Sequence, residues 1–166
     1  MGKEKKCTLY KKYTSYKKCI PYLILAGFTF FFCWWFVGRH GIFGAKVDWL
    51  SQHSVLPDYF RQQFYATGKI FPEFAPNLGG GQNIYHFAYY GLYSPLILPS
   101  YLFPFVKMSD YIMVISITGL TVSVLLFYYW LKSRKMDTGV AFIISLMFML
   151  AGPMIGQFSG QIMFVD

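Results

Sequence analysis

Residues 111–131 read YIMVISITGLTVSVLLFYYWL and contain no charged residue. About 20 predominantly apolar residues cross a bilayer as one helix, so this run predicts a transmembrane helix. A second charge-free run of similar length, residues 19–38, comes before it and predicts another. A third run, residues 138–165, follows it. The runs therefore decide the fold class, which is a membrane protein built from helices.

The third run is interrupted by Gly152-Pro153, and proline breaks or kinks a helix. We therefore expect the third transmembrane helix to occupy residues 138–156 and the next element to begin within residues 157–166. Glycines at every fourth position from Gly152 favour close packing against another helix.

The composition agrees with this class. The chain is 55% hydrophobic and only 13% charged, whereas about a quarter of the residues of a soluble domain are charged. We expect an all-α polytopic membrane protein with three transmembrane helices and a large first loop, residues 39–110, that carries interfacial helices. The cysteines lack the spacing of metal ligands.

Basic residues set the expected orientation. The tail, residues 1–18, holds seven lysines against Glu4, and the short loop at residues 132–137 holds Lys132, Arg134 and Lys135. The positive-inside rule places both in the cytoplasm and residues 39–110 outside the cell. The expected location is the cell membrane, with a cytoplasmic N-terminus. A basic tail beside a membrane helix favours anionic lipid as its partner and argues against nucleic acid.

The large loop begins with a helical pattern over residues 46–66. Its apolar positions follow the helical period at Trp49, Leu56, Phe60 and Phe64. Asp48 and Gln52 are four residues apart and share another face, whereas His53 points elsewhere on a regular α-helix. Pro57 predicts a kink or a split. Such a helix can lie in the membrane surface and hold Asp48 at the boundary with water.

The rest of the loop is rich in glycine and proline. Residues 67–77 predict a loop, and Gly79, Gly80 and Gly81 follow it. Residues 74–106 carry no charge, but their prolines argue against a spanning helix. We expect one or two short helices there.

Several residues of this loop can carry chemistry. Asp48 is the candidate catalytic residue, as a general base or as a metal ligand. The candidate substrate-binding residues are Gln52, His53, Arg61, Lys69, Gly79, Gly80, Gly81 and Asn83. Arg61 is three residues from Asp58, so a simple ion pair is the alternative. The glycines can bind a phosphate through their N–H groups or form a tight turn. The sequence requires no cofactor, and a divalent metal remains open.

The order of these stretches resembles the N-terminal part of the YfhO family of bacterial membrane proteins. The matching pieces are KVDWLSQH (residues 46–53), LPDYFR (56–61), GKIFP (68–72), LGGGQN (78–83) and YYGLYSP (89–95). That family is similar to glycosyltransferases of the GT-C fold. The resemblance implies transfer of a sugar from a polyprenyl-phosphate donor to a cell-envelope polymer such as lipoteichoic acid, on the outer membrane face. It also implies that the acidic residue of the first outer loop, here Asp48, is central to the chemistry.

Members of that family are longer and have more membrane helices, so the chain is expected to be an N-terminal part. Two other functions stay open on the sequence. One is a transporter or flippase component, which calls for ionisable residues inside the crossings, and the three runs have none. The other is a non-catalytic membrane scaffold.

Overall fold

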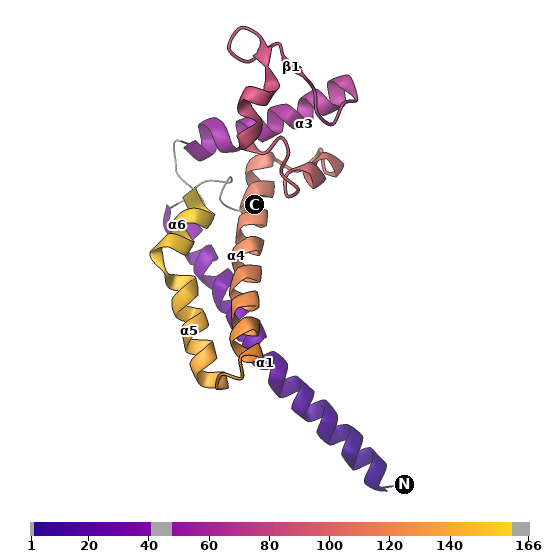
Figure 1. Ribbon diagram of the computed structural model, residues 1–166, viewed down its shortest axis with the longest axis vertical. Coiled ribbons are helices and arrows are strands. Elements are labelled where there is room, and N and C mark those ends of the chain that lie inside the picture. The colour runs from indigo at the N-terminus through magenta and orange to yellow at the C-terminus, as the bar shows by residue number, and fades with distance from the viewer. Residues whose placement is uncertain (1, 41–47, 161–166) are drawn as a thin grey trace.

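The structure, a computed structural model, describes residues 2–40 and 48–160, with side chains for residues 18–39 and 48–156. The elements in chain order are α1 (Gly2–His40), η1 (Trp49–His53), α3 (Val55–Thr67), β1 (Phe74–Ala75), β2 (Gln82–Asn83), η2 (Ile84–Tyr90), η3 (Leu98–Leu102), α4 (Met108–Ser133), α5 (Thr138–Leu150) and α6 (Gly152–Gly160). Helices α1, α4 and α5 lie side by side, and residues 48–107, here called the head region, lie at one end of them (Figure 1). The fold is mostly helical, as expected, apart from the two short strands.

Among the residues that the structure describes, two helices are long and apolar enough to cross a membrane. They are Lys18–Arg39, with a mean hydropathy of 1.8, and Met108–Ser133, with a mean hydropathy of 2.0. Only 17% of the first apolar stretch and 33% of the second are buried inside the protein, so most of their apolar side chains face outward. A core helix of a soluble protein would be mostly buried. The two helices correspond to the crossings predicted at residues 19–38 and 111–131.

The third predicted crossing, residues 138–156, is not one continuous helix. Helix α5 ends at Leu150, Ala151 is extended with φ −62° and ψ 130°, and α6 starts at Gly152. The expected break at Gly152-Pro153 is therefore present. Helix α5 has 13 residues and is about 20 Å long, shorter than the roughly 30 Å of a bilayer core. A third crossing stays a prediction. Of the next element predicted at residues 157–166, the helix α6 reaches Gly160, and the remainder lies outside the described residues.

The three neighbouring helices share one apolar core. Its fully or almost fully buried members are Leu25, Cys33, Leu120, Val124, Tyr128, Leu131, Ala141 and Met149. The Thr29 hydroxyl donates to the Leu25 carbonyl at 2.8 Å, and its oxygen lies 3.2 Å from the Met149 sulfur, a contact that joins α1 to α5. Ala141 and Ser145 are fully buried on α5, and such small residues let helices approach closely.

The head region has a core of its own. The helix predicted for residues 46–66 is present in its described part as two pieces, η1 and α3, which meet at Ser54. Pro57 lies in the first turn of α3, where a missing N–H is tolerated. Phe60 packs with Ile84, Leu92 and other residues of the following segment. The sequence predicts one or two short helices in residues 74–106, and the structure has two, η2 and η3.

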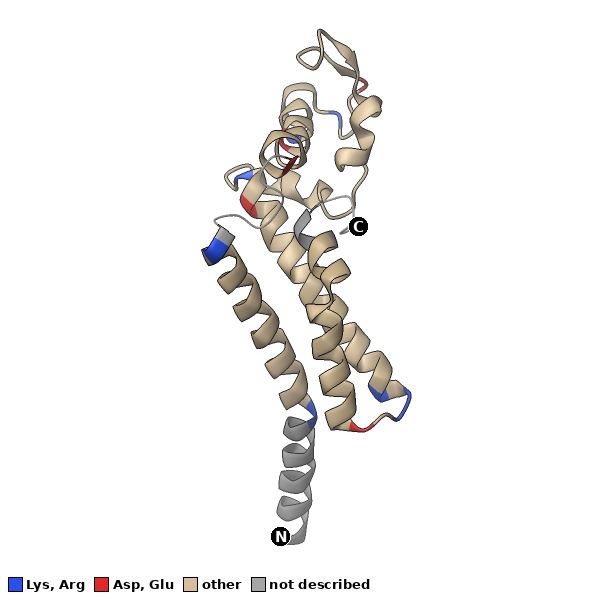
Figure 2. Cartoon of the chain, turned by 90° about the vertical axis from the view of Figure 1, so that its left-hand side faces the viewer, with Lys and Arg blue, Asp and Glu red and all other residues tan. Residues whose placement is uncertain are grey.

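Figure 2 shows how the charges are distributed over the chain. Among the residues drawn in colour, charged ones lie in the head region, at the ends of α1 and α4 next to it and at the opposite end of the helices, and the long middle of α1, α4 and α5 has none (Figure 2). This is the arrangement that a membrane-crossing unit requires, because a charge in the bilayer core is costly.

The close approach of α5 to α4 depends on Ala141. Replacing Ala141, which is 0% exposed, with Leu is expected to destabilise the fold by about 1–3 kcal/mol because the larger side chain overpacks the core. The control is Val140→Leu, since the adjacent Val140 faces outward. Equilibrium unfolding in mixed detergent micelles measures both variants. Equal effects of the two substitutions would contradict the packing described here.

Candidate functional site

The predicted catalytic residue Asp48 lies immediately before a π-helical turn, η1. The N–H of Ser54 donates to the carbonyl of Trp49 at 3.0 Å, a bond between residues five apart. A π-helical turn has more residues than an α-helical turn. Residues five apart, such as Asp48 and His53, therefore lie closer to the same side of the helix than they do in an α-helix. His53 is therefore closer to Asp48 than a regular α-helix predicts.

Trp49 fixes η1 to the beginning of α4. Its side chain is buried and packs with Ile97, Met108 and Ile112. Because α4 is long and apolar enough to cross a membrane, this contact holds the turn that follows Asp48 at the beginning of such a helix. The half-buried Asp48 side chain remains partly accessible.

Two side chains of η1, Gln52 and His53, meet Tyr90 of η2 near this turn, and Asp48 comes just before the turn. The Tyr90 hydroxyl donates a hydrogen bond to the side-chain oxygen of Gln52. The rings of His53 and Tyr90 have their centroids 5.5 Å apart. The negative charge of Asp48 acts on the pKa values of both His53 and Tyr90. We call Asp48, Gln52, His53 and Tyr90 the acid–tyrosine cluster.

The imidazole of His53 is held neutral. Burial lowers its pKa below the ordinary value, and the nearby Asp48 charge opposes this only in part. The side chain is 2% exposed, and its Nδ1 atom has no hydrogen-bond partner within the described part of the chain. A buried polar atom without a partner costs free energy, and such atoms are often explained by function.

Tyr90 is likewise held in its neutral, proton-donating form. A hydrogen bond with Tyr89 is the largest cause that raises its pKa, to about 12, followed by burial and the charges of Tyr89 and Asp48. The rings of Tyr89 and Tyr90 have centroids 4.2 Å apart, and Tyr89 is 59% exposed. Together, a carboxylate, an amide, a neutral imidazole and a phenol supply both acceptors and donors to a hydroxyl-rich ligand, beside an exposed aromatic ring.

The structure unites only part of the predicted site. Asp48, Gln52 and His53 belong to the acid–tyrosine cluster. Lys69 is exposed and lies 3.8 Å from Glu73, and Asn83 accepts a hydrogen bond from the Tyr85 N–H at 2.9 Å, which caps η2.

Gly79, Gly80 and Gly81 form the turn of the β1–β2 hairpin, with φ values of +55°, +81° and +97°. A side chain at Gly81 would also meet the Phe74 ring at 3.0 Å. The tight-turn alternative is therefore present, and the hairpin lies beyond α3, away from α4 (Figure 1). A binding role for these glycines, for Lys69 and for Asn83 stays a prediction.

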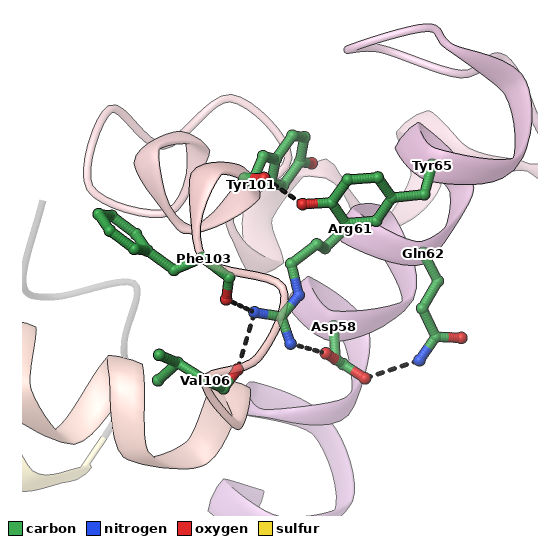
Figure 3. A network of polar contacts seen from close by, with 7 residues as sticks. All are labelled: Asp58, Arg61, Gln62, Tyr65, Tyr101, Phe103 and Val106. Carbon is green, nitrogen blue, oxygen red and sulfur yellow. Dashed lines mark hydrogen bonds and ion pairs between the residues drawn. The ribbon is translucent and has the colours of Figure 1, made fainter.

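Arg61 has a structural role, which is shown in Figure 3. Its guanidinium donates to the Phe103 carbonyl at 3.2 Å and to the Val106 carbonyl at 2.9 Å, and it pairs with Asp58 at 2.5 Å. The predicted Asp58–Arg61 pair is thus confirmed. The two carbonyl contacts join α3 to the segment that enters α4.

Tyr90 was not among the residues predicted for the site. The Tyr89-Tyr90 pair stands in a stretch without charges, and hydroxyls in such a stretch are a weak signal. Its contact with Gln52 spans 38 residues of sequence, which no local pattern reveals. No group of three or more His, Cys, Asp or Glu side chains that could hold a metal ion occurs among the described residues. Asp48 and His53 together supply two possible metal ligands, one fewer than such a group requires.

The two apolar helices and the head region docked on one of them define a helical membrane protein. The chain matches the family described as Bacterial membrane protein YfhO over residues 18–166. It belongs to that family, since the match covers nearly the whole chain. No curated protein and no solved structure matches it.

The Arg61 contacts predict a strong effect of substitution. Arg61→Met leaves Asp58 with the Gln62 amide, at 2.7 Å, as its remaining partner and removes the donors of two carbonyl contacts, so we expect a loss of about 2–3 kcal/mol. Lys69→Met, which breaks an exposed pair, is the control and should cost less than about 1 kcal/mol. The measurement is equilibrium unfolding in mixed micelles. A small loss for Arg61→Met would show that α3 is held by other contacts.

The lowered pKa of His53 predicts a pH dependence. The unfolded chain binds a proton at the ordinary pKa and the folded chain only at a lower pH. The contribution of His53 to the free energy of unfolding is therefore fully present above pH 6.5 and is lost as the pH falls toward the lower pKa of the folded state. His53→Gln should remove this component from the unfolding free energy measured between pH 7.5 and 5, a range that brackets the ordinary His value.

The control for that measurement is His86→Gln, because His86 is exposed. It should leave the pH dependence as it is in the wild type. The buried, neutral state of His53 would be contradicted if the two variants behaved alike.

Proposed function

We propose that the chain acts as a membrane glycosyltransferase, or as the N-terminal part of one, with the acid–tyrosine cluster in its active site. The donor is a polyprenyl-phosphate-linked sugar, and the acceptor is a cell-envelope polymer such as lipoteichoic acid. The observation that carries the proposal is the placement of Asp48. Asp48 precedes a turn that packs on the beginning of α4, a helix long and apolar enough to cross a membrane, and a lipid-linked phosphate would lie near the end of such a helix.

The reaction needs one proton acceptor and a leaving group. An acceptor hydroxyl gives its proton to the Asp48 carboxylate while its oxygen attacks the anomeric carbon of the donor sugar. The bond between that carbon and the phosphate oxygen breaks, and polyprenyl phosphate leaves with the electron pair. A positioned general base of this kind contributes about 10²–10⁴-fold to a rate.

The other members of the cluster have roles that follow from their protonation states. The neutral His53 imidazole carries no charge that would pair with the Asp48 carboxylate. The Tyr90 hydroxyl and the Gln52 amide hold each other in place and orient hydroxyls of the sugar. The exposed Tyr89 ring offers a flat apolar face of the kind that packs against a sugar ring.

The same proposal includes the orientation and the fold. The head region faces outward and the N-terminus lies in the cytoplasm, because the lysines of the tail and the basic turn after α4 are at the opposite end of the helices. The tail contacts anionic lipid; side chains of residues 1–17 lie outside the described set. The complete fold is of the GT-C type, with a third crossing made by α5 together with α6.

A non-catalytic scaffold is the second candidate, and α6 favours it. A side chain added at Gly152 or Gly156 would meet no atom within 4 Å, so this glycine face is open to another helix. The same face would also serve an enzyme with additional helices.

Replacing Asp48 with Asn in the gene of the source bacterium tests the catalytic proposal. We expect the sugar content of the envelope polymer, measured by NMR of the purified polymer, to fall by about 10²-fold or more, because Asn accepts no proton. The amount of the protein in the membrane should not change. Asp110→Asn is the control, since Asp110 is exposed at the first turn of α4.

An unchanged sugar content with Asp48→Asn would rule out Asp48 as the base. If deletion of the whole gene also leaves the polymer unchanged, the glycosyltransferase proposal fails and the scaffold remains.

A further inference from the structure

A cavity lies at the end of the helices opposite the head region. It has a volume of about 420 Å³ and is lined by residues of α1, of α4 and of the first turn of α5, namely Lys18, Pro21, Tyr22, Tyr128, Lys132 and Thr138. Figure 2 shows basic positions on α1 and at the turn after α4 at this end. We propose that this cavity binds the headgroup of an anionic phospholipid. The inference does not rest on the proposed function.

The two lysines approach the cavity from different helices. The Lys132 ammonium donates to the Met136 carbonyl at 2.8 Å and to the Thr138 hydroxyl at 2.9 Å. An ammonium has three donors, so the third remains for a ligand, and the two bonds hold the charge in a fixed place. Lys18 is exposed on α1 and brings a second positive charge to the same space.

The one acidic group at this turn, Asp137, is engaged elsewhere. Its carboxylate accepts from the N–H groups of Gly139 and Val140 at 2.8 and 3.3 Å, which caps α5. These backbone hydrogen bonds are the main cause that lowers the pKa of Asp137, and the Lys132 charge contributes least. Lys18 and Lys132, which line the cavity, outweigh this single carboxylate, so the cavity is positive on balance. Arg134, which lies over the Trp130 ring at 5.6 Å, and Lys135 do not line it.

The walls of the cavity suit a lipid rather than a free phosphate ion. Pro21 and the rings of Tyr22 and Tyr128, which meet edge to face with centroids 4.8 Å apart, form an apolar surface. The neighbouring residues Leu23 and Ile24 on α1 are exposed and apolar, so an acyl chain can follow the helix from here. A basic pocket between membrane helices is the arrangement that binds anionic lipid headgroups.

The test is native mass spectrometry of the full chain, titrated with phosphatidylglycerol and with phosphatidylcholine of the same acyl chains. Each lysine near a membrane surface contributes about 1 kcal/mol, or about fivefold in affinity. We expect Lys18→Gln to weaken phosphatidylglycerol binding about fivefold, and Lys18→Gln with Lys132→Gln about twentyfold. Phosphatidylcholine, which has no net charge, should bind weakly to every variant.

The matched control removes the same charge outside the cavity, by Arg134→Gln with Lys135→Gln, and should cost less than about threefold. An equal loss in both pairs would mean diffuse attraction to a basic surface and would overturn the proposal. Lys132 also holds the turn, so the double variant Lys18→Gln with Lys132→Gln can fail to fold. In that case the double variant Lys18→Gln with Lys132→Arg replaces it. It keeps the charge at position 132 and should behave as Lys18→Gln alone.

Inorganic phosphate in large excess distinguishes the two sources of a phosphate ligand. We expect it to leave bound phosphatidylglycerol in place. Displacement of the lipid would identify the cavity as a site for free phosphate and would contradict the lipid proposal.

Discussion

The position of the head region depends on the Arg61 guanidinium. It pairs with Asp58 on its own helix and donates to the carbonyls of Phe103 and Val106, which end the head region. One planar group thus serves three acceptors from two parts of the chain. Hydrogen bonds to a charged group are stronger than neutral ones. This contact ties α3 to the segment entering α4, and Trp49 makes the second attachment on α4 itself.

The acid–tyrosine cluster follows from that attachment. Once α3 and the start of α4 are held together, η1 lies against η2, and Gln52 meets Tyr90. The π-helical turn then brings His53 under the influence of Asp48. None of these side chains is unusual by itself. Their meeting at the beginning of a helix that is long and apolar enough to cross a membrane is the feature on which the proposed function depends.

Much of the fold could be predicted from local patterns. The two crossings follow from charge-free runs, and the break after α5 follows from Gly152-Pro153. The helix around Phe60 follows from the apolar period, and the Asp58–Arg61 pair from a spacing of three. These features depend on residues close in sequence.

The site could be predicted only in part, for physical reasons. Asp48 and Gln52 share a face on any helix. His53 joins them through a π-helical turn, for which the sequence carries no signal. Tyr90 comes from 38 residues away, and the partners of Arg61 are backbone carbonyls, which have no side-chain signature. The cavity at the opposite end needs α1, α4 and α5 in their packed positions, so its lysines looked like ordinary flanking charges.

The central claim is that the acid–tyrosine cluster is assembled by contact between η1 and η2. A double-mutant cycle on the unfolding free energy, with Gln52→Ala and Tyr90→Phe, tests it most directly. A hydrogen bond between the two side chains predicts a coupling of about 0.5–1.5 kcal/mol. Effects of the two substitutions that add within about 0.3 kcal/mol would contradict the contact and, with it, the assembled site.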